Sequence, residues 1–330
     1  MMSRRRFLAA AAGTGIAAHL APFAKPAFAQ AIAKPARMIV GFQAGGAPDA
    51  VARLLAEQMK DYAPSLIIDN RPGAGGRMAL EALRASEADG SAMVLTPVDQ
   101  LALFPHVYSR LSYRPIEDFA PVTTVCSVQF LLAVGPRVPA RVRSLADFIG
   151  WCRENPELAS YGTGGAGTHP HFIGVTLGRV AGFQFVHVPY KGGASGMQDV
   201  IGGHLAAFIA TSGTLLPNIQ SRVLRALATT APNRSAALPD VPTFKETGHP
   251  ALESIERFGI LVPARTPADV IASLHGAIRQ ALQSEAVKAG LARLSLEPIE
   301  TSPSEFARLI SSETQRWAEV VKASGFKPMD

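Results

Sequence analysis

The sequence predicts an α/β protein built from two doubly wound lobes, in which helices cover both faces of parallel sheets. Short apolar runs alternate with amphipathic stretches along the chain, and this alternation is typical of β–α units. The chain has 330 residues, 48% of them apolar, and a chain of this size forms a large core divided between about two domains. No internal repeat or low-complexity tract interrupts the pattern.

Six runs are predicted as strands because they are apolar and too short for helices. They are residues 37–42, 66–69, 92–95, 129–134, 185–188 and 205–210. Two stretches are predicted as amphipathic helices. In residues 49–61, Val51 and Leu55 share an apolar face, and residues 268–283 have the same helical spacing.

Two segments predict where the chain passes between domains. One is Gly-Pro-Arg-Val-Pro at 135–139, and the other is the segment 258–263. We therefore expect residues 30–135 and 259–330 to form the first lobe and residues 136–258 to form the second. A chain that leaves its first domain and later returns places a ligand cleft between two lobes that can hinge shut.

Residues 1–29 have the three parts of a twin-arginine signal peptide. Three consecutive arginines begin at Arg4, an apolar stretch covers residues 8–20, and Ala-Phe-Ala at 27–29 precedes a cleavage site. A membrane anchor is the alternative, but it needs about 20 apolar residues, and here the stretch is shorter and Pro22 follows it. We therefore expect export to the periplasm.

The basic character of the chain belongs mainly to this segment. It contains three arginines, Lys25 and no acid, so its removal lowers the net charge from +6 to +2. No Lys/Arg run remains that would follow a phosphate backbone, and nucleic acid is not an expected partner. Cys126 and Cys152 are too few for a disulfide framework, and we expect both as free buried thiols.

Two glycine-rich turns, residues 42–49 and 161–168, each lie between a strand-like run and a helix-like run. Such turns direct backbone N–H groups, at the positive end of a helix dipole, toward an anion. In the first turn, Gly45 and Gly46 let the backbone approach a ligand closely, and Asp49 lies at the helix start. The sequence predicts a pocket for a small anion, with a purely structural turn as the alternative.

The second turn also matches the dinucleotide fingerprint G-x-G-x-x-G through Gly162, Gly164 and Gly167. A dinucleotide site needs an acid about twenty residues later to bind the ribose hydroxyls. The chain has no Asp or Glu between Glu157 and Asp199. We therefore expect no nucleotide and no other cofactor.

Metal and nucleophile chemistry are also not indicated. His169 and His171 form an H-x-H pair, but residues two apart on a helix do not face the same way, and no clustered third ligand is visible. The sequence around Ser195 is G-A-S-G-M rather than the G-x-S-x-G of a hydrolase nucleophile. We expect a protein that is not an enzyme.

Several linked motifs together resemble the periplasmic substrate-binding receptors of tripartite tricarboxylate transporters, the Bug family. The motifs cover essentially the whole mature chain: residues 42–49 with 52–55, 69–76, 113–122, 161–171, 188–193, 238–243 and 258–263. The resemblance implies a type II periplasmic-binding-protein fold with a hinged cleft. It also implies a small organic carboxylate as ligand and the integral membrane permease subunits as partners, and we expect a monomer.

The resemblance also implies which residues bind the ligand. In the family, backbone amides and hydroxyls of the strand-to-helix loops hold the carboxylate. The positions carried over to this sequence are Phe42, Gln43, Gly45, Gly46, Asp49, Thr96, Thr163, Gly164, Thr168, His171, Thr211, Ser212 and Phe258.

The sequence departs from the family pattern at three places. Family members usually have an acid where this chain reads Leu-Ala-Ala at 205–207 and another near 210–212, and a proline is common where it reads Gln43-Ala44. Because no acid is evident opposite the carboxylate clamp, we expect no ligand with an ammonium group. Two other functions stay open: an enzyme on the same fold, as a hydrolase or transferase, and a sensory adaptor for a membrane signalling protein.

Overall fold

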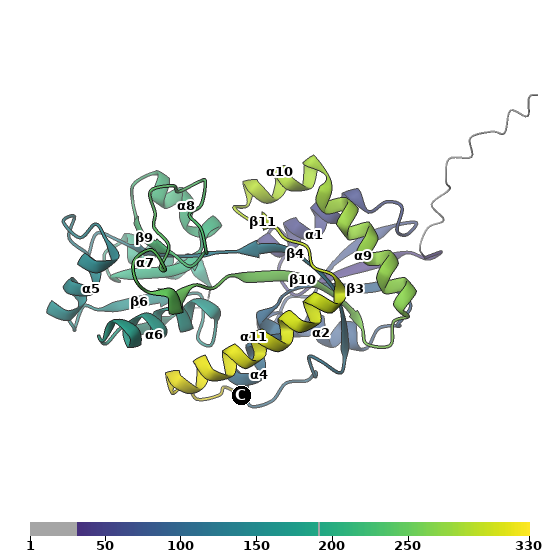
Figure 1. Ribbon diagram of the computed structural model, residues 1–330, viewed down its shortest axis with the longest axis horizontal. Helices are drawn as coiled ribbons and strands as arrows, with labels where there is room; N and C mark the ends of the chain where they lie inside the picture. The colour runs from purple at the N-terminus through teal and green to yellow at the C-terminus, as the bar shows by residue number, and fades with distance from the viewer. Residues whose placement is uncertain (1–31, 191) are drawn as a thin grey trace, which may run out of the picture.

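The computed structural model describes residues 32–190 and 192–330, and their strands form two sheets placed one after the other along the long axis (Figure 1). The first sheet has six strands in the order β11-β4-β10-β3-β1-β2, and the second has five in the order β7-β6-β8-β5-β9. The predicted signal peptide, residues 1–29, lies outside the described residues. Of the helices that the structure describes, none has both the length and the apolar composition to cross a membrane.

All six predicted strands are confirmed to within a few residues, and five further strands were not predicted. The strands are β1 (Ala36–Val40), β2 (Leu66–Asn70), β3 (Ala92–Pro97), β4 (Phe119–Val128), β5 (Phe130–Val134), β6 (Ser160–Thr163), β7 (Val186–Pro189), β8 (Ala207–Thr211), β9 (Arg225–Thr229), β10 (Glu256–Pro263) and β11 (Glu297–Pro298).

Both predicted helices are confirmed, as α1 and α9. The α-helices are α1 (Ala47–Gln58), α2 (Arg77–Arg84), α3 (Asp99–Ala102), α4 (Phe104–Val107), α5 (Leu145–Glu154), α6 (His169–Ala181), α7 (Gly193–Ile201), α8 (Ser212–Gln220), α9 (Ala268–Gln283), α10 (Glu285–Arg293) and α11 (Pro303–Ser324). Two 3-10 turns, η1 (Ala74–Gly76) and η2 (Pro250–Leu252), complete the described elements.

Each sheet contains three neighbouring parallel strands: β2, β1 and β3 in the first sheet, and β7, β6 and β8 in the second. The prediction of parallel sheets is confirmed only for these trios. β10 runs antiparallel between β3 and β4, and β5 runs antiparallel between β8 and β9. These two strands are antiparallel to their neighbours because each begins at the edge of its sheet where the parallel strands end.

The chain passes between the sheets at other positions than expected. The first passage is at Gln129, between β4 and β5, and the whole of β5 belongs to the second sheet, although residues up to 135 were assigned to the first lobe. The segment 258–263 is not a crossing but part of β10 in the first sheet. The Gly-Pro segment at 135–139 follows the end of β5. Glycine and proline also end strands within a domain, so they do not by themselves mark a domain boundary.

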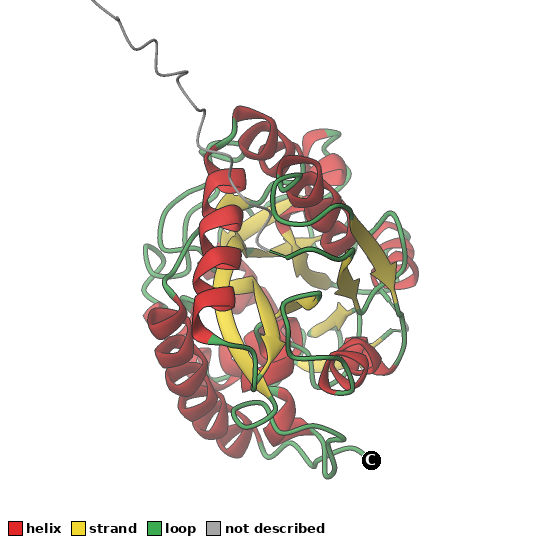
Figure 2. Cartoon of the chain, turned by 90° about the vertical axis from the view of Figure 1, so that its right-hand side faces the viewer, coloured by secondary structure: helices red, strands yellow, loops and turns green. Residues whose placement is uncertain are grey.

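Apolar side chains are buried on both faces of each sheet. The first sheet packs against α1, α9 and α10 on one face and against α2, α3, α4 and α11 on the other. The second sheet packs against α5 and α6 on one face and α7 and α8 on the other. Figure 2 shows helices on both sides of the strands. Cys126 and Cys152 are buried in different clusters and are free, as predicted.

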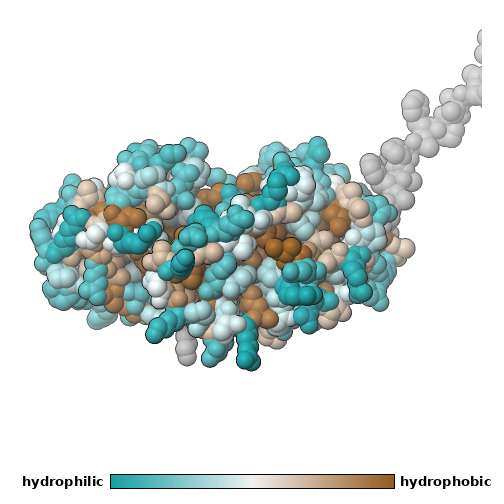
Figure 3. All heavy atoms as spheres, turned by 60° about the horizontal axis from the view of Figure 1, so that its bottom comes forward, coloured by the Kyte–Doolittle hydropathy of each residue, from teal (hydrophilic) through white to brown (hydrophobic). Residues whose placement is uncertain are grey.

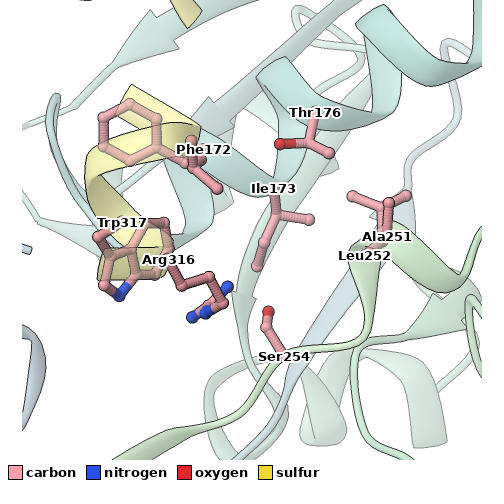
Figure 4. A pocket seen from close by; sticks show the side chains of 9 residues that line it. Phe172, Ile173, Thr176, Ala251, Leu252, Ser254, Arg316 and Trp317 are labelled. Carbon is pink, nitrogen blue, oxygen red and sulfur yellow. The ribbon is translucent and has the colours of Figure 1, made fainter. Parts of the chain in front are cut away.

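The C-terminal helix α11 contacts both halves of the molecule. Its start has a capping box, in which Ser302 accepts from the N–H of Glu305 and the Glu305 side chain accepts from Ser302. Its middle covers β4 of the first sheet. Farther along, the Trp317 ring lies 5.8 Å from the Phe172 ring of α6, which belongs to the second half. Figure 4 shows these two rings on one side of a small hollow between α6, α11 and η2.

Exposed apolar side chains are scattered over the surface. The large ones among the described residues are Ile67, Met78, Ile116, Val180, Val186 and Val223. On the face in Figure 3, apolar residues are interspersed with hydrophilic ones and form several separate patches. Scattered exposure of this kind is normal for a soluble surface.

Gly259, in the middle of β10, lets α11 pack directly on the sheet. A Cβ atom at this position would lie 2.2 Å from Cζ of the buried Phe306 ring. Displacing a central strand or a buried ring costs free energy. We therefore expect Gly259→Ala to lower the free energy of unfolding by about 1–3 kcal/mol in urea titrations.

The control for this variant is Gly276→Ala in α9. No atom lies within 4 Å of a Cβ at Gly276, so this change should stabilise the protein by about 0.5–1 kcal/mol through helix propensity. Equal unfolding free energies for the two variants would contradict the packing argument.

Candidate functional site

A cavity of about 430 Å³ lies between the two sheets, and we call it the interlobe cavity. Its described lining residues are Phe42, Ala47, Pro48, Gly75, Pro97, Asp99, Gln100, Leu103, Phe104, Tyr108, Gly164, Ala166, Gly167, Thr168, His169, Pro170, Thr211, Glu256 and Phe258. Most of them lie just after β1, β3, β6 or β8. The carboxyl ends of parallel strands meet at one edge of a sheet, so loops far apart in sequence converge there.

The carboxylate of Asp49 fixes the first glycine-rich turn. Its Oδ2 accepts hydrogen bonds from the N–H of Gly45 and from Nε of Arg53, both at 2.9 Å, and its Oδ1 accepts from Nδ2 of Asn70 at 2.9 Å. The Arg53 hydrogen bond, helped by those of Gly45 and Asn70, lowers the pKa of Asp49 to about 2 against the opposing effect of burial. The φ angle of Gly45 is +87°, which favours glycine. Asp49 therefore stabilises the turn but is not among the described lining residues, whereas Ala47 of the same turn lines the cavity.

The second glycine-rich turn is fixed by two threonine hydroxyls. The Thr163 hydroxyl donates to the carbonyl oxygen of Gly165 at 2.9 Å, and it also lies 2.8 Å from Nε2 of His187. The Thr168 hydroxyl donates to the same Gly165 oxygen at 2.8 Å. Thr168 occupies the N-cap position of α6, but its side chain makes no capping hydrogen bond.

Two helix N-termini therefore face one cavity. The first residues of α1 (Ala47 and Pro48) and of α6 (His169 and Pro170) line it, and neither helix has a side-chain cap. The first N–H groups of a helix have no acceptor within the helix, and the helix dipole is positive at this end. The remaining N–H groups of these helix starts are therefore available as donors, although Pro48 and Pro170 have none, and the anion pocket stays a prediction.

His171 is not among the described lining residues of this cavity. It is buried, its Nδ1 accepts from the N–H of Gly167 at 3.2 Å, and its ring stacks on His187 with centroids 4.0 Å apart. Burial lowers the pKa of His171 to about 4, and burial together with the neighbouring His171 lowers the pKa of His187 to about 3. Both imidazoles are therefore neutral near pH 7.

Of the predicted binding residues, five line the interlobe cavity: Phe42, Gly164, Thr168, Thr211 and Phe258. The other eight are not among its described lining residues: Gln43, Gly45, Gly46, Asp49, Thr96, Thr163, His171 and Ser212. Several of these support the lining residues; the buried Thr96, for example, donates to Oε1 of Gln100 at 2.5 Å, and Gln100 lines the cavity. Their roles toward a ligand stay predictions.

Two acids that the sequence analysis missed line the same cavity. Oδ2 of Asp99 lies 3.0 Å from Nδ1 of His169, whose Nε2 lies 2.9 Å from the Ser254 hydroxyl. Glu256, the first residue of β10, lies within hydrogen-bonding reach of Asp99. Burial raises the pKa of Glu256 well above its usual range, and the negative charge of Asp99 raises it further. The expectation that the cavity contains no acid for an ammonium group was therefore wrong.

The sequence held no local signal for this cluster. Its members come from three distant segments, Asp99 after β3, His169 at the start of α6 and Glu256 at the start of β10. Only the antiparallel entry of β10 places its first residue at the edge where the parallel strands end. Within the described residues, no group of three His, Cys, Asp or Glu side chains could hold a metal ion.

A second cavity of about 470 Å³ adjoins the first, and we call it the side cavity. Ala47, Thr211 and Phe258 line both cavities. The other walls of the side cavity come mainly from α8 and from the turn between α10 and β11. A molecule longer than the interlobe cavity could extend into it.

The buried histidine pair predicts acid sensitivity. In the unfolded chain each imidazole has a pKa near 6.5. Below this pH the unfolded state binds a proton at each imidazole, whereas the folded state does so only below about pH 4. Stability is thus full above about pH 6.5 and falls with decreasing pH, by about 1.4 kcal/mol per unit for each imidazole. We expect His187→Gln, which keeps a polar partner for Thr163, to reduce the loss of stability between pH 7 and pH 5 in urea titrations.

The exposed His204 provides the control. His204→Gln should leave the pH dependence of unfolding unchanged, because an exposed imidazole is solvated in both states. If His187→Gln and His204→Gln have the same pH dependence as the unchanged protein, the buried pair does not cause the acid sensitivity.

Several known proteins are similar to this chain in sequence and in fold. Protein BugT of Bordetella pertussis is 33% identical over 297 residues, which are 89% of this chain and 90% of that protein. A structure of an R. palustris protein with adipate has a TM-score of 0.79 and 30% identity, over 90% of this chain and 99% of that one. MatC from Rhodopseudomonas palustris with bound malate has a TM-score of 0.74 and 25% identity, over 87% and 99%.

The family described as tripartite tricarboxylate transporter family receptor matches residues 51–326, which include every strand of both sheets except β1 and most of the lining of the interlobe cavity, but not Phe42, Ala47 and Pro48. The structural neighbours include the periplasmic binding protein BugD, with a TM-score of 0.76 and 26% identity. The fold is accordingly the two-lobed fold of periplasmic binding proteins. The chain belongs to the tripartite tricarboxylate transporter receptors of the Bug family.

Proposed function

We propose that this receptor binds a small organic carboxylate in the interlobe cavity, carries out no covalent chemistry on it and delivers it to the permease subunits of a tripartite transporter. One observation carries the proposal: two uncapped helix N-termini, one from each half of the molecule, line the same cavity. Backbone donors at such ends bind carboxylates readily. Relatives solved with adipate and malate support the same ligand class.

The division into lobes that fits this function follows the sheets. The first lobe would contain β1–β4, β10 and β11 with their helices, and the second would contain β5–β9. A ligand that contacts both lobes favours the closed arrangement, because only that arrangement offers all its contacts at once. Export through the twin-arginine segment 1–29 to the periplasm and a monomeric state belong to the same proposal.

The ligand itself can be identified directly. Native mass spectrometry of protein purified from the periplasm should show a small acid bound in a 1:1 complex. Calorimetry and thermal unfolding with a panel of mono- and dicarboxylates, amino acids and adipate should then show saturable binding, which raises the unfolding temperature by mass action. Turnover of an ester or phosphate substrate by the pure protein, or the absence of binding across the whole panel, would contradict the proposal.

A bulky side chain where the two cavities meet should weaken binding. Ala47 lines both cavities, so we expect Ala47→Trp to lower the affinity for the bound acid at least about tenfold in calorimetry, with little change in unfolding temperature. Ala44→Trp is the matched control, because Ala44 is exposed on the same turn and lines neither cavity. Equal affinities for the two variants would place the ligand elsewhere.

Asp49 should act on the ligand through the turn that it fixes. Asp49→Asn keeps the shape of the side chain but removes the charge that Arg53 and the N–H of Gly45 bind. We expect about 1–2 kcal/mol lower stability near pH 7 and weaker binding of the acid. The Asp49 contribution is fully present above about pH 4 and is lost as pH falls through about 2, because its pKa is lowered. Asp61→Asn, at an exposed site, should change neither stability nor affinity.

A further inference from the structure

The acid pair of the interlobe cavity lies against a contact that joins the two lobes. Asp99 belongs to the first lobe, and His169, 3.0 Å away, belongs to the second. The His169 ring is 2% exposed and packs between Phe130 of the second sheet, at 4.7 Å, and Trp317 of α11, at 4.6 Å. The position of Asp99 relative to the opposite wall is thus fixed when the lobes meet.

The charged side chains among the described lining residues of this cavity are acids. Its described lining residues include Asp99 and Glu256 but no Lys and no Arg. Arg257, the next residue of β10, is not among them; its guanidinium interacts electrostatically with Asp99 as well as with Glu313 and Arg316 of α11, and it lines a separate hollow with the last two. His169 and Tyr108 are the other titratable residues among its described lining residues. Among the described lining residues the acid pair therefore has no Lys or Arg; Asp99 has His169 as a hydrogen-bond partner, and Arg257 interacts with its charge from outside the lining.

A pair of carboxyl groups in this position is costly without a ligand. Two adjacent carboxylates in a largely apolar cavity repel each other, so one of them keeps its proton. Asp99 has Nδ1 of His169 as a partner at 3.0 Å, whereas burial and the charge of Asp99 raise the pKa of Glu256, so we assign the proton to Glu256. A carboxylate at this end of a ligand would meet the charge of Asp99, and an apolar tail would offer the two acids no hydrogen bond. A cation would remove the repulsion.

We infer that the ligand is an organic acid that also carries a protonated amine, and that Asp99 and Glu256 bind this amine while the two helix N-termini bind the carboxylate. This inference rests on the proposed function, and it names the substrate class of the same cavity. When the amine binds, the ammonium group keeps its three protons and the carboxyl group of Glu256 releases its proton to the solvent. Binding therefore releases up to one proton per ligand.

Matched probes test the inference: 6-aminohexanoate, hexanoate and adipate, together with α-amino acids and the corresponding acids without the amine. Calorimetry at pH 7 in phosphate and in Tris buffer gives affinity and the number of protons released. We expect amine-bearing acids to bind at least about tenfold more tightly than their partners. Their binding enthalpy should differ between the two buffers, and their affinity should rise with increasing pH, because binding releases a proton.

Glu256→Gln provides the decisive variant, because it keeps the shape of the side chain but cannot ionise. It should lose the preference for the amine and the proton release, while binding of the acid without an amine is kept. Glu253→Gln is the control: Glu253 lies three residues earlier, pairs with Lys245 at 3.4 Å and does not line the cavity. If Glu256→Gln does not fold, Asp99→Asn and the proton release of the unchanged protein test the same point.

Each outcome decides between the two levels of the proposal. A preference for acids without an amine, or binding without proton release, overturns the inference and leaves the carboxylate receptor intact. Binding of neither class overturns both. A preference for the amine that Glu256→Gln retains would assign the amine to other groups and overturn the role of the acid pair.

Discussion

The structure depends on the convergence of strand ends. Parallel strands in each sheet end at the edge that faces the other sheet, so the helices that follow them begin there with unsatisfied N–H groups. Two such helix starts, α1 and α6, face one cavity from opposite sides. Backbone groups can bind a carboxylate without an arginine because the helix dipole adds to several N–H groups at once. The side chains of the turns are then free for support, as Asp49 and Thr163 are.

The two ends of the proposed ligand would have different surroundings in this arrangement. The helix starts offer donors and positive potential, whereas Asp99 and Glu256 offer acceptors and negative charge. Both lie in a cavity with mostly apolar walls, where charges act more strongly than in water. A difference of this kind selects ligands by the position of their charges as well as by their size.

Helix α11 contacts both lobes and also the His169 ring beside the acid pair. It packs on the first sheet through Phe306 and reaches α6 of the second lobe through Trp317, which also contacts the His169 ring. The same His169 contacts Asp99 and the Ser254 hydroxyl, which lies just before β10. A change at the acid pair therefore alters the Asp99–His169 contact between the lobes. It also alters the segment around Ser254, which joins the lobes.

The sequence by itself determined the features that depend on neighbouring residues. Local apolar patterns predicted six strands and two helices, and the glycine-rich turns predicted the two helix starts, because strand, turn and helix start follow one another within a few residues. The capping box of Ser302 and Glu305 is a local signal of the same kind that would have predicted α11. Only the tertiary structure decided where the chain crosses between sheets and which side chains face the cavity. Asp99, His169 and Glu256 meet because β10 enters its sheet from the edge where β3 ends, and no spacing along the chain encodes this entry.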